Sequence, residues 1–274
     1  MDQSSSVISQ ADSALYITFF PSLAASPIRI PITTPYRPGV FVCANSLVVS
    51  DKVVHAKTRY NLRFFEILVS ARILARILGV AIGEKEPVTM REVVGRWLGG
   101  DTNLDVPTLK KGLEDLAGRI SVMKLVDSDG SDGTETGVTL DEMITLTGMS
   151  KEDFEEVYLS NASGTLQSCL TGRLSALVDD IYAVEATHFQ LYKRTKHVLP
   201  EAWRVLEFHD VCLRAEQENA LASDSDAYLR ELGSIMDASH KSCSELCENS
   251  CPEVDLLVRL AKEAGAYGSR VTGD

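Results

Sequence analysis

The longest apolar stretch of the chain, FFEILVSARILARILGVAIG at residues 64–83, bears most directly on whether the fold is membrane-spanning or globular. Glu66, Arg72 and Arg76 interrupt it, and a helix with three charges is too polar to span a bilayer. Its apolar residues recur at helical spacing, so the sequence predicts an amphipathic helix over about 59–79. The polar start carries no signal-peptide pattern, and we expect a cytoplasmic globular protein with no membrane partner.

Composition narrows the classes of function. The chain has 274 residues, enough for one or two domains, and 27 basic against 39 acidic residues give a formal net charge of −12. Because acidic residues outnumber basic ones, nucleic acid is not expected as a partner. A local basic pocket for one phosphorylated ligand remains allowed. Six cysteines are too few for a disulfide scaffold, which favours a reducing compartment.

Two segments near the start have the composition of β-strands, ALYITFF at 14–20 and VFVCANSLVV at 40–49. Five prolines lie in the connection between them: Pro21, Pro27, Pro31, Pro35 and Pro38. Proline excludes a helix interior and cannot donate a ladder hydrogen bond, so this connection is predicted to be a surface or edge segment. With helical patterns dominating the second half, the sequence predicts an α+β fold.

Helix signals mark several elements of the second half. Thr139 and Ser150 are suited to be the N-caps of two short helices. A helical pattern over 185–221 contains Pro200, which should kink or divide the helix.

The segment SCPEVDLLVRLAKEAG at 250–265 carries start and stop signals for one further helix. Ser250 and Glu253 have the spacing of a capping box, and Pro252 fits the first turn. Gly265 is suited to end the helix.

Two patterns were tested as metal sites. One histidine and three cysteines are spaced by three or four residues, as zinc ligands on one helix face would be: His240, Cys243, Cys247 and Cys251. Buried or unpaired thiols are the better interpretation, since the spacing matches no known knuckle. The acidic loop DSDGSDGTETG at 127–137 fails the calcium-loop template because Asp132 stands where the glycine belongs. We therefore expect no metal-binding residue.

The segment GSRVTG at 268–273 places two glycines around small hydroxyl residues. Such spacing lets backbone N–H groups approach an anion, and Arg270 adds positive charge. The alternative is an ordinary glycine turn after a helix, which is common in proteins.

Four segments, in this order along the chain, carry a family resemblance: MDQSSS at 1–6, ANSLVVSDKVVHAKTRYNLRFFE at 44–66, HFQLYKRTKHVLPEAWRVL at 188–206, and SCPEVDLLV with AYGSRVTG near the end. Together they resemble the galactokinases of the GHMP kinase family, most closely the fungal ones. The resemblance implies a two-lobe GHMP kinase-like fold, with residues 1–55 the end of the N-terminal lobe and 56–274 the C-terminal lobe. It also implies MgATP and galactose as substrates.

The same resemblance assigns roles to individual residues. Asp2 matches the catalytic carboxylate that accepts or orients the proton of the galactose O1 hydroxyl, and Tyr60 matches a tyrosine that hydrogen-bonds the sugar. Ser50, Asp51 and Lys52 match a turn that contacts the nucleotide. The loop lining the cleft between the lobes would comprise Gly268, Ser269, Arg270, Thr272 and Gly273. A core role for Tyr60 and a plain turn at 50–52 remain the alternatives.

The sequence also departs from the family pattern. It lacks the first motif, with most sugar contacts, and the second, the loop that cradles the ATP phosphates, so we expect the C-terminal part of a galactokinase that is inactive by itself. Residues 161–180 interrupt the family pattern, and they are expected to be either a true insertion or a mistranslated intron. A galactose-sensing co-inducer that signals to a transcriptional repressor without turnover is an alternative function, and a non-functional product of a faulty gene model is a third.

Overall fold

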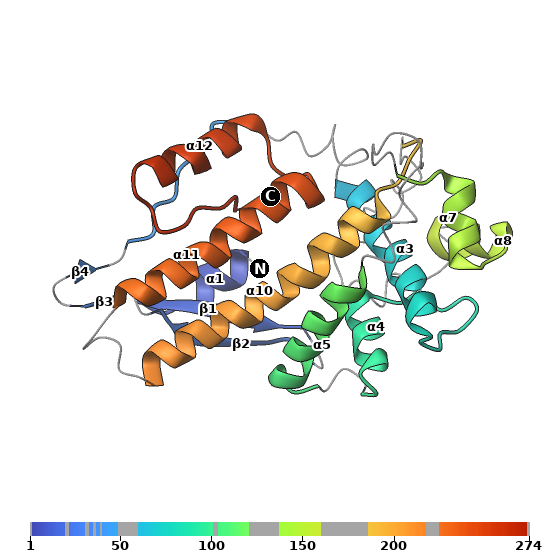
Figure 1. The fold of residues 1–274 in the computed structure, drawn as a ribbon, viewed down its shortest axis with the longest axis horizontal. Helices are drawn as coiled ribbons and strands as arrows, with labels where there is room; N and C mark the ends of the chain where they lie inside the picture. Colours follow the sequence, from blue (N-terminus) through green and yellow to red (C-terminus); the bar gives the residue numbers. More distant parts are fainter. Residues whose placement is uncertain are drawn as a thin grey trace. The chain divides into compact units, whose positions relative to one another are not determined.

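The computed structural model describes most of the chain, and Figure 1 shows its elements. The backbone is described for residues 2–19, 22–30, 33–34, 37–38, 40–48, 60–100, 104–120, 137–159, 186–217 and 225–272. Side chains are described for the same residues except 2–4, 33–34, 37–38, 60 and 225. The chain divides into two compact units: unit 1 contains 1–49 and 201–274, and unit 2 contains 50–200.

Unit 1 combines short strands with helices from the end of the chain. In chain order its elements are α1 (Asp2–Ile8), β1 (Ser13–Thr18), β2 (Ala24–Arg29), β3 (Thr33–Thr34), β4 (Arg37–Pro38), the later part of α10 (Leu191–Gln217), α11 (Ser225–Ser242), the π-helical η5 (Cys243–Cys247) and α12 (Pro252–Glu263). β1 and β2 pair antiparallel from Ser13 opposite Arg29 to Thr18 opposite Ala24, and β3 pairs with β4.

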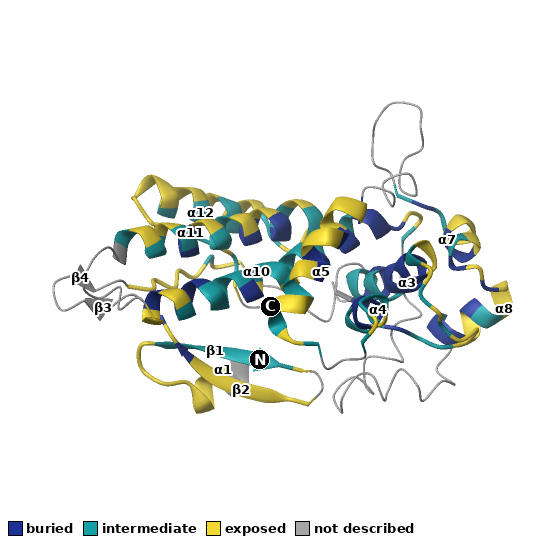
Figure 2. Ribbon diagram, turned by 60° about the horizontal axis from the view of Figure 1, so that its bottom comes forward, coloured by how far each residue is buried: buried dark blue, intermediate teal, exposed yellow. Residues whose placement is uncertain are grey.

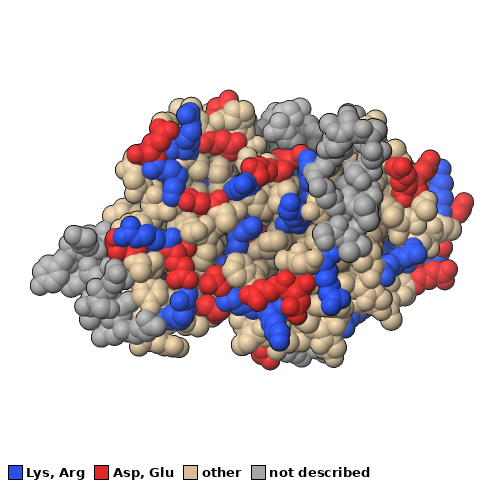
Figure 3. All heavy atoms as spheres, in the orientation of Figure 1, with Lys and Arg blue, Asp and Glu red and all other residues tan. Residues whose placement is uncertain are grey.

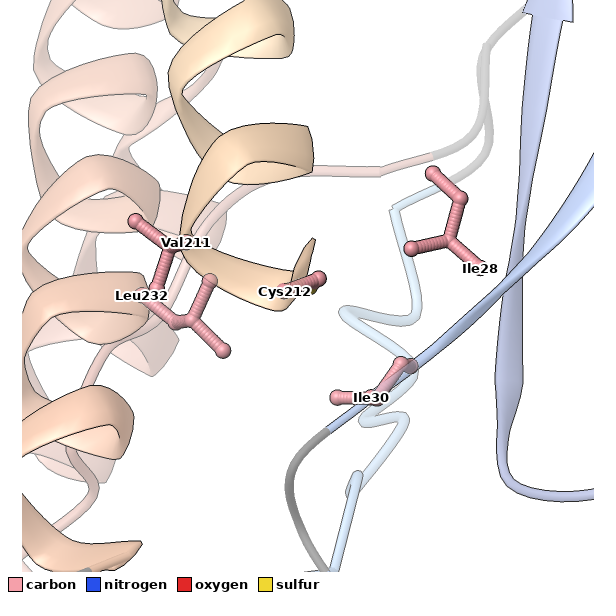
Figure 4. Packing of buried hydrophobic residues seen from close by; sticks show 5 residues of the cluster. All are labelled: Ile28, Ile30, Val211, Cys212 and Leu232. Atoms are coloured by element: carbon pink, nitrogen blue, oxygen red, sulfur yellow. The ribbon is translucent and has the colours of Figure 1, made fainter. Parts of the chain in front are cut away.

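One small hydrophobic cluster joins the β1–β2 hairpin to α10 and α11. Ile28 and Ile30 pack with three residues of the two helices, Val211, Cys212 and Leu232, as Figure 4 shows. Burial raises the pKa of the Cys212 thiol to about 11, because the apolar surroundings disfavour the thiolate. This cluster is what holds the hairpin against the helices.

Unit 2 is helical in its described part. Its elements are α3 (Tyr60–Leu78), α4 (Met90–Trp97), α5 (Val106–Arg119), α7 (Leu140–Thr147), α8 (Lys151–Phe154), the π-helical η2 (Glu155–Leu159) and the first turns of α10. Phe65 on α3 forms the centre of an aromatic group, with ring centroids 6.2 Å from Phe154, 6.5 Å from Tyr158 and 5.6 Å from Phe189. These rings join α3 to α8, η2 and the residues before α10.

Two charged residues of α3 lie inside unit 2. Glu66 accepts a hydrogen bond from Arg194 Nε at 2.5 Å and another from the Gln190 backbone N–H at 2.7 Å, with both charged side chains almost fully buried. Arg72 donates to the backbone carbonyls of Glu84 at 2.7 Å and Thr147 at 3.4 Å. Removing one partner of a buried ion pair typically costs about 3–5 kcal/mol, so Glu66 and Arg194 fix the start of α10 on α3.

Several sequence predictions are confirmed. The predicted strand at 14–20 is β1, and the helix predicted over 59–79 is α3. Thr139 and Ser150 cap α7 and α8, each side-chain oxygen accepting a backbone N–H three residues later. Gly265 ends α12 with φ +94° in a Schellman arrangement, in which its own N–H donates to Lys262 and the next N–H donates to Ala261.

Two predictions are wrong, and a third is wrong in one of its two alternatives. Residues 40–48 form no strand; the Leu47 N–H donates instead to Asn45 Oδ1 at 2.8 Å, a local turn that competes with strand pairing. Pro200 does not divide its helix, since α10 runs through it, so of the two predicted effects only the kink stays a prediction. The N-cap of α12 is Cys251, because Ser250 Oγ donates to Asp255 at 2.6 Å and forms no capping box with Glu253. The predicted insertion at 161–180 lies outside the described residues.

Candidate functional site

The predicted sugar- and nucleotide-contacting residues are only partly described. Asp2 is the first residue of α1 and Tyr60 the first residue of α3, but their side chains lie outside the described part of the structure. Ser50, Asp51 and Lys52 also lie outside it. These assignments therefore stay predictions.

The loop at 268–272, which we call the C-terminal loop, is described, apart from the following Gly273. It lies against α11 at a point where two glycines meet. A Cβ on Gly233 would lie 2.2 Å from the Tyr267 carbonyl oxygen, and a Cβ on Gly268 would lie 2.4 Å from the Gly233 Cα. The two backbones can approach this closely only because neither residue has a side chain.

Side chains of α11 accept the backbone amides of this loop. The Ser269 N–H donates to Asp237 Oδ1 at 2.9 Å, and the Val271 N–H donates to His240 Nδ1 at 3.3 Å. Both amides are thus used inside the protein. This arrangement argues against the interpretation of the glycine spacing as an anion cradle.

The charges around the C-terminal loop are paired. Arg270 Nη1 lies 3.6 Å from Glu201 Oε1, and Arg204 Nη1 donates to the same carboxylate at 2.6 Å. Lys262 Nζ lies 2.6 Å from Asp237 Oδ2 and donates to the Tyr267 carbonyl at 2.7 Å. Basic and acidic side chains also alternate over the face of the molecule in Figure 3. Arg270 therefore has a carboxylate neighbour, which it shares with Arg204.

His240, considered above as a zinc ligand, has another role in the structure. Its Nδ1 accepts from the Val271 amide, and its Nε2 lies 3.3 Å from Asp255 Oδ1 on α12. Burial raises the pKa of the Cys243 thiol, which disfavours the thiolate that zinc would need. In the described ranges, no three histidine, cysteine or acidic residues are grouped to hold a metal ion.

Sequence reasoning missed the residues of α11 that hold the C-terminal loop. Gly233, Asp237 and His240 are separated by four and three residues, so they lie on one face of the helix. This spacing could have been recognised in the sequence. It predicts that the three residues share a helix face, but it does not predict what that face contacts.

The described elements define a helix-rich α+β protein with two small antiparallel sheets. None of the helices in the described ranges is long and apolar enough to cross a membrane. No protein-family model matches the chain.

Individual relatives are more informative. Over its whole length the chain is 30% identical to the galactokinase of Saccharomyces cerevisiae, 32% to that of Dictyostelium discoideum and 28% to that of Candida albicans. It covers 48%, 47% and 48% of these proteins respectively. The resemblance to galactokinases is thus confirmed along the whole chain, which spans about half the length of the relatives it matches.

Proposed function

We propose that this chain is part of a galactokinase, which transfers the γ-phosphoryl group of ATP to O1 of α-D-galactose and forms galactose 1-phosphate. The observation that carries the proposal is the similarity over the whole chain to galactokinases of three organisms. A cytoplasmic location agrees with this function. The two substrates, galactose and ATP, are the proposed small-molecule partners.

The acceptor side of the reaction is where this chain would contribute chemistry. Asp2 would accept or orient the O1 proton, and general-base assistance of this kind contributes on the order of 10²–10⁴-fold in rate. Tyr60 would hydrogen-bond a sugar hydroxyl and hold the ring in place. Both residues stand at the first position of a helix, so backbone N–H groups not used within the helix lie close to each.

The donor side rests on the resemblance alone. Mg²⁺ bound to ATP would neutralise charge that develops on the phosphoryl oxygens. The Ser269 and Val271 amides of the C-terminal loop donate to side chains of α11, so the loop does not offer these two groups to an ATP phosphate. The C-terminal loop would therefore act only indirectly, as a fixed wall beside the nucleotide.

A chimaera tests the proposal. In it, this chain replaces the matched segment of the D. discoideum galactokinase, and formation of galactose 1-phosphate from galactose and MgATP is measured. We expect product from the chimaera and none from the 274-residue chain alone. A folded chimaera that binds galactose and ATP but forms no product would favour the co-inducer alternative, and one that binds neither ligand would contradict both functions.

A further inference from the structure

His240 on α11 is a titratable side chain that holds the C-terminal loop. Its Nδ1 accepts a hydrogen bond from the Val271 backbone N–H at 3.3 Å, and its Nε2 lies 3.3 Å from Asp255 Oδ1 on α12. A backbone N–H can only donate, so Nδ1 carries a free lone pair and no proton. The ring proton then stands on Nε2, where Asp255 can accept it. Both contacts are therefore satisfied by one neutral tautomer of His240.

Uptake of a second proton changes what this ring can do. Histidine is the side chain that ordinarily changes charge between about pH 5 and about pH 8. In the imidazolium form both ring nitrogens carry a proton and both donate. A protonated Nδ1 of His240 would face the Val271 N–H with two donors and no acceptor between them. The contact with the loop is thus compatible with the neutral ring alone.

Most charged groups on the elements around His240 already have partners of opposite sign. These groups come from α10, α11, α12 and the C-terminal loop: Asp237 with Lys262, and Glu201 with Arg204 and Arg270. Cys243 lies three residues after His240 on α11, and burial raises the pKa of its thiol, which favours the neutral form. The remaining charged group is Asp255.

Asp255 is the carboxylate that would stabilise a protonated His240. In the part of the chain that the structure describes, it accepts hydrogen bonds from Ser250 Oγ at 2.6 Å and Ser244 Oγ at 3.1 Å, and no lysine or arginine pairs with it. Its side chain is 43% exposed, and Figure 2 shows α12 only in the exposed and intermediate colours, so solvent reaches this carboxylate. The imidazolium would therefore gain an ion pair with Asp255 while it loses the Val271 amide.

We propose that His240 is a pH-dependent latch, which holds the C-terminal loop on α11 at Val271 when the ring is neutral and releases it when the ring takes up a second proton. The proton comes from solvent onto Nδ1, and the Val271 N–H then bonds to water. Since release takes up one proton, holding is favoured at high pH. It weakens as pH falls, by up to about tenfold per pH unit.

The release is confined to one end of the loop. The Ser269 N–H donates to Asp237, and Gly268 packs on Gly233, so neither contact needs a histidine. Ser269 therefore serves as an internal reference for Val271. The proposal goes beyond the proposed function and does not depend on it, because every group in it belongs to the described part of this chain.

The test uses the complete 274-residue chain, labelled for NMR. Hydrogen exchange of the backbone amides is measured at about pH 8 and at about pH 5, and the intrinsic rate at each pH is divided by the measured rate to give a protection factor. Protection of Val271 should fall at least about tenfold between the two, and that of Ser269 less than about threefold. The nitrogen shifts of the His240 ring should show Nδ1 without a proton at the higher pH and protonated at the lower.

Three variants identify the group responsible. His240→Gln has no charge to gain, so Val271 protection should be the same at both pH values within about twofold. His188→Gln is the matched control, because this exposed histidine bonds to Thr187 and its replacement should leave the pH dependence of the parent. Asp255→Asn keeps a carbonyl acceptor for the two serines but removes the negative charge, so the loss of protection should move to lower pH.

The proposal is overturned by equal protection of Val271 at the two pH values in the unsubstituted chain, or by a protonated Nδ1 at the higher pH. An equally large fall at Ser269 would show that the whole loop loosens and would also overturn it. So would a pH dependence that persists in His240→Gln or disappears in His188→Gln. An unmoved transition in Asp255→Asn would overturn the role given to Asp255. The measurements on the unsubstituted chain decide the matter even where a variant does not fold.

Discussion

Gly233 is the residue at which α11 and the C-terminal loop come closest. A methyl group there would lie 2.2 Å from the Tyr267 carbonyl oxygen and 2.8 Å from the Gly268 nitrogen, and both atoms belong to the backbone. Gly233→Ala should therefore push the loop away and lower the free energy of unfolding by about 1–3 kcal/mol, as overpacking does. Urea denaturation followed by circular dichroism measures this.

Gly118 offers a matched control for that substitution. It also lies in a helix, α5, but a Cβ there would meet nothing within 4 Å. Gly118→Ala should stabilise the protein by roughly 0.5–1 kcal/mol, because alanine loses less backbone entropy in a helix. If the two substitutions had the same effect, the close packing of the loop on α11 would be refuted.

Asp237 is the carboxylate that accepts the Ser269 amide and pairs with Lys262. Asp237→Ala should cost about 0.5–1.5 kcal/mol and accelerate hydrogen exchange at the Ser269 amide. Asp237→Asn keeps a carbonyl acceptor at the same place, so it should preserve much of the protection.

The exposed pair Arg259–Glu263 provides the control. Its atoms are 3.8 Å apart and both side chains are more than half exposed, so Glu263→Ala should change stability by less than about 0.5 kcal/mol. Unchanged exchange at Ser269 in Asp237→Ala would show that the carboxylate does not hold the loop.

At the scale of elements, α10 is unusual because it contains a proline in its interior. Pro200 lacks the N–H that would bond to the carbonyl four residues earlier, and its ring crowds that turn. Pro200→Ala should raise the free energy of unfolding by up to about 3 kcal/mol. Val205→Ala, at a half-exposed position of the same helix, should change it by no more than about 0.5 kcal/mol.

If Pro200→Ala instead lowered the free energy of unfolding, the packing of α10 would depend on the distortion that the proline imposes. Equilibrium unfolding in urea distinguishes the two results. Because the boundary between the two units falls at Pro200, the change should be followed with probes in both units.

Local signals explain which elements were predictable. The caps at Thr139 and Ser150 and the end of α12 at Gly265 depend on neighbouring residues alone, so the sequence contains what is needed. The strand predicted at 40–49 failed because a strand requires a partner, and composition does not supply one. The capping box at Ser250 failed because a competing acceptor, Asp255, lies one turn into the helix.

At the scale of the whole molecule, the resemblance to galactokinases was predictable because several segments match in the right order. The contacts of the C-terminal loop were not, since glycine spacing does not reveal which groups accept the Ser269 and Val271 amides. Those acceptors come from α11, about thirty residues earlier in the chain. Only a three-dimensional arrangement identifies them.

The roles assigned to Asp2 and Tyr60 are tested in the chimaera described above, because the complete active site is needed. Asp2→Asn keeps the shape and a hydrogen-bonding group but cannot accept a proton, so kcat should fall by at least about 10²-fold with galactose binding largely kept. Tyr60→Phe removes one hydroxyl contact and should mainly raise the KM for galactose, about two- to tenfold.

The most direct measurement of the central claim is steady-state kinetics of the chimaera and its Asp2→Asn variant, with galactose varied at saturating MgATP. The proposed function predicts that the parent forms galactose 1-phosphate and that Asp2→Asn loses kcat, the signature of a group that acts in the transition state. A parent chimaera that folds and binds both substrates without turnover, or an Asp2→Asn variant with near-normal kcat, would contradict it.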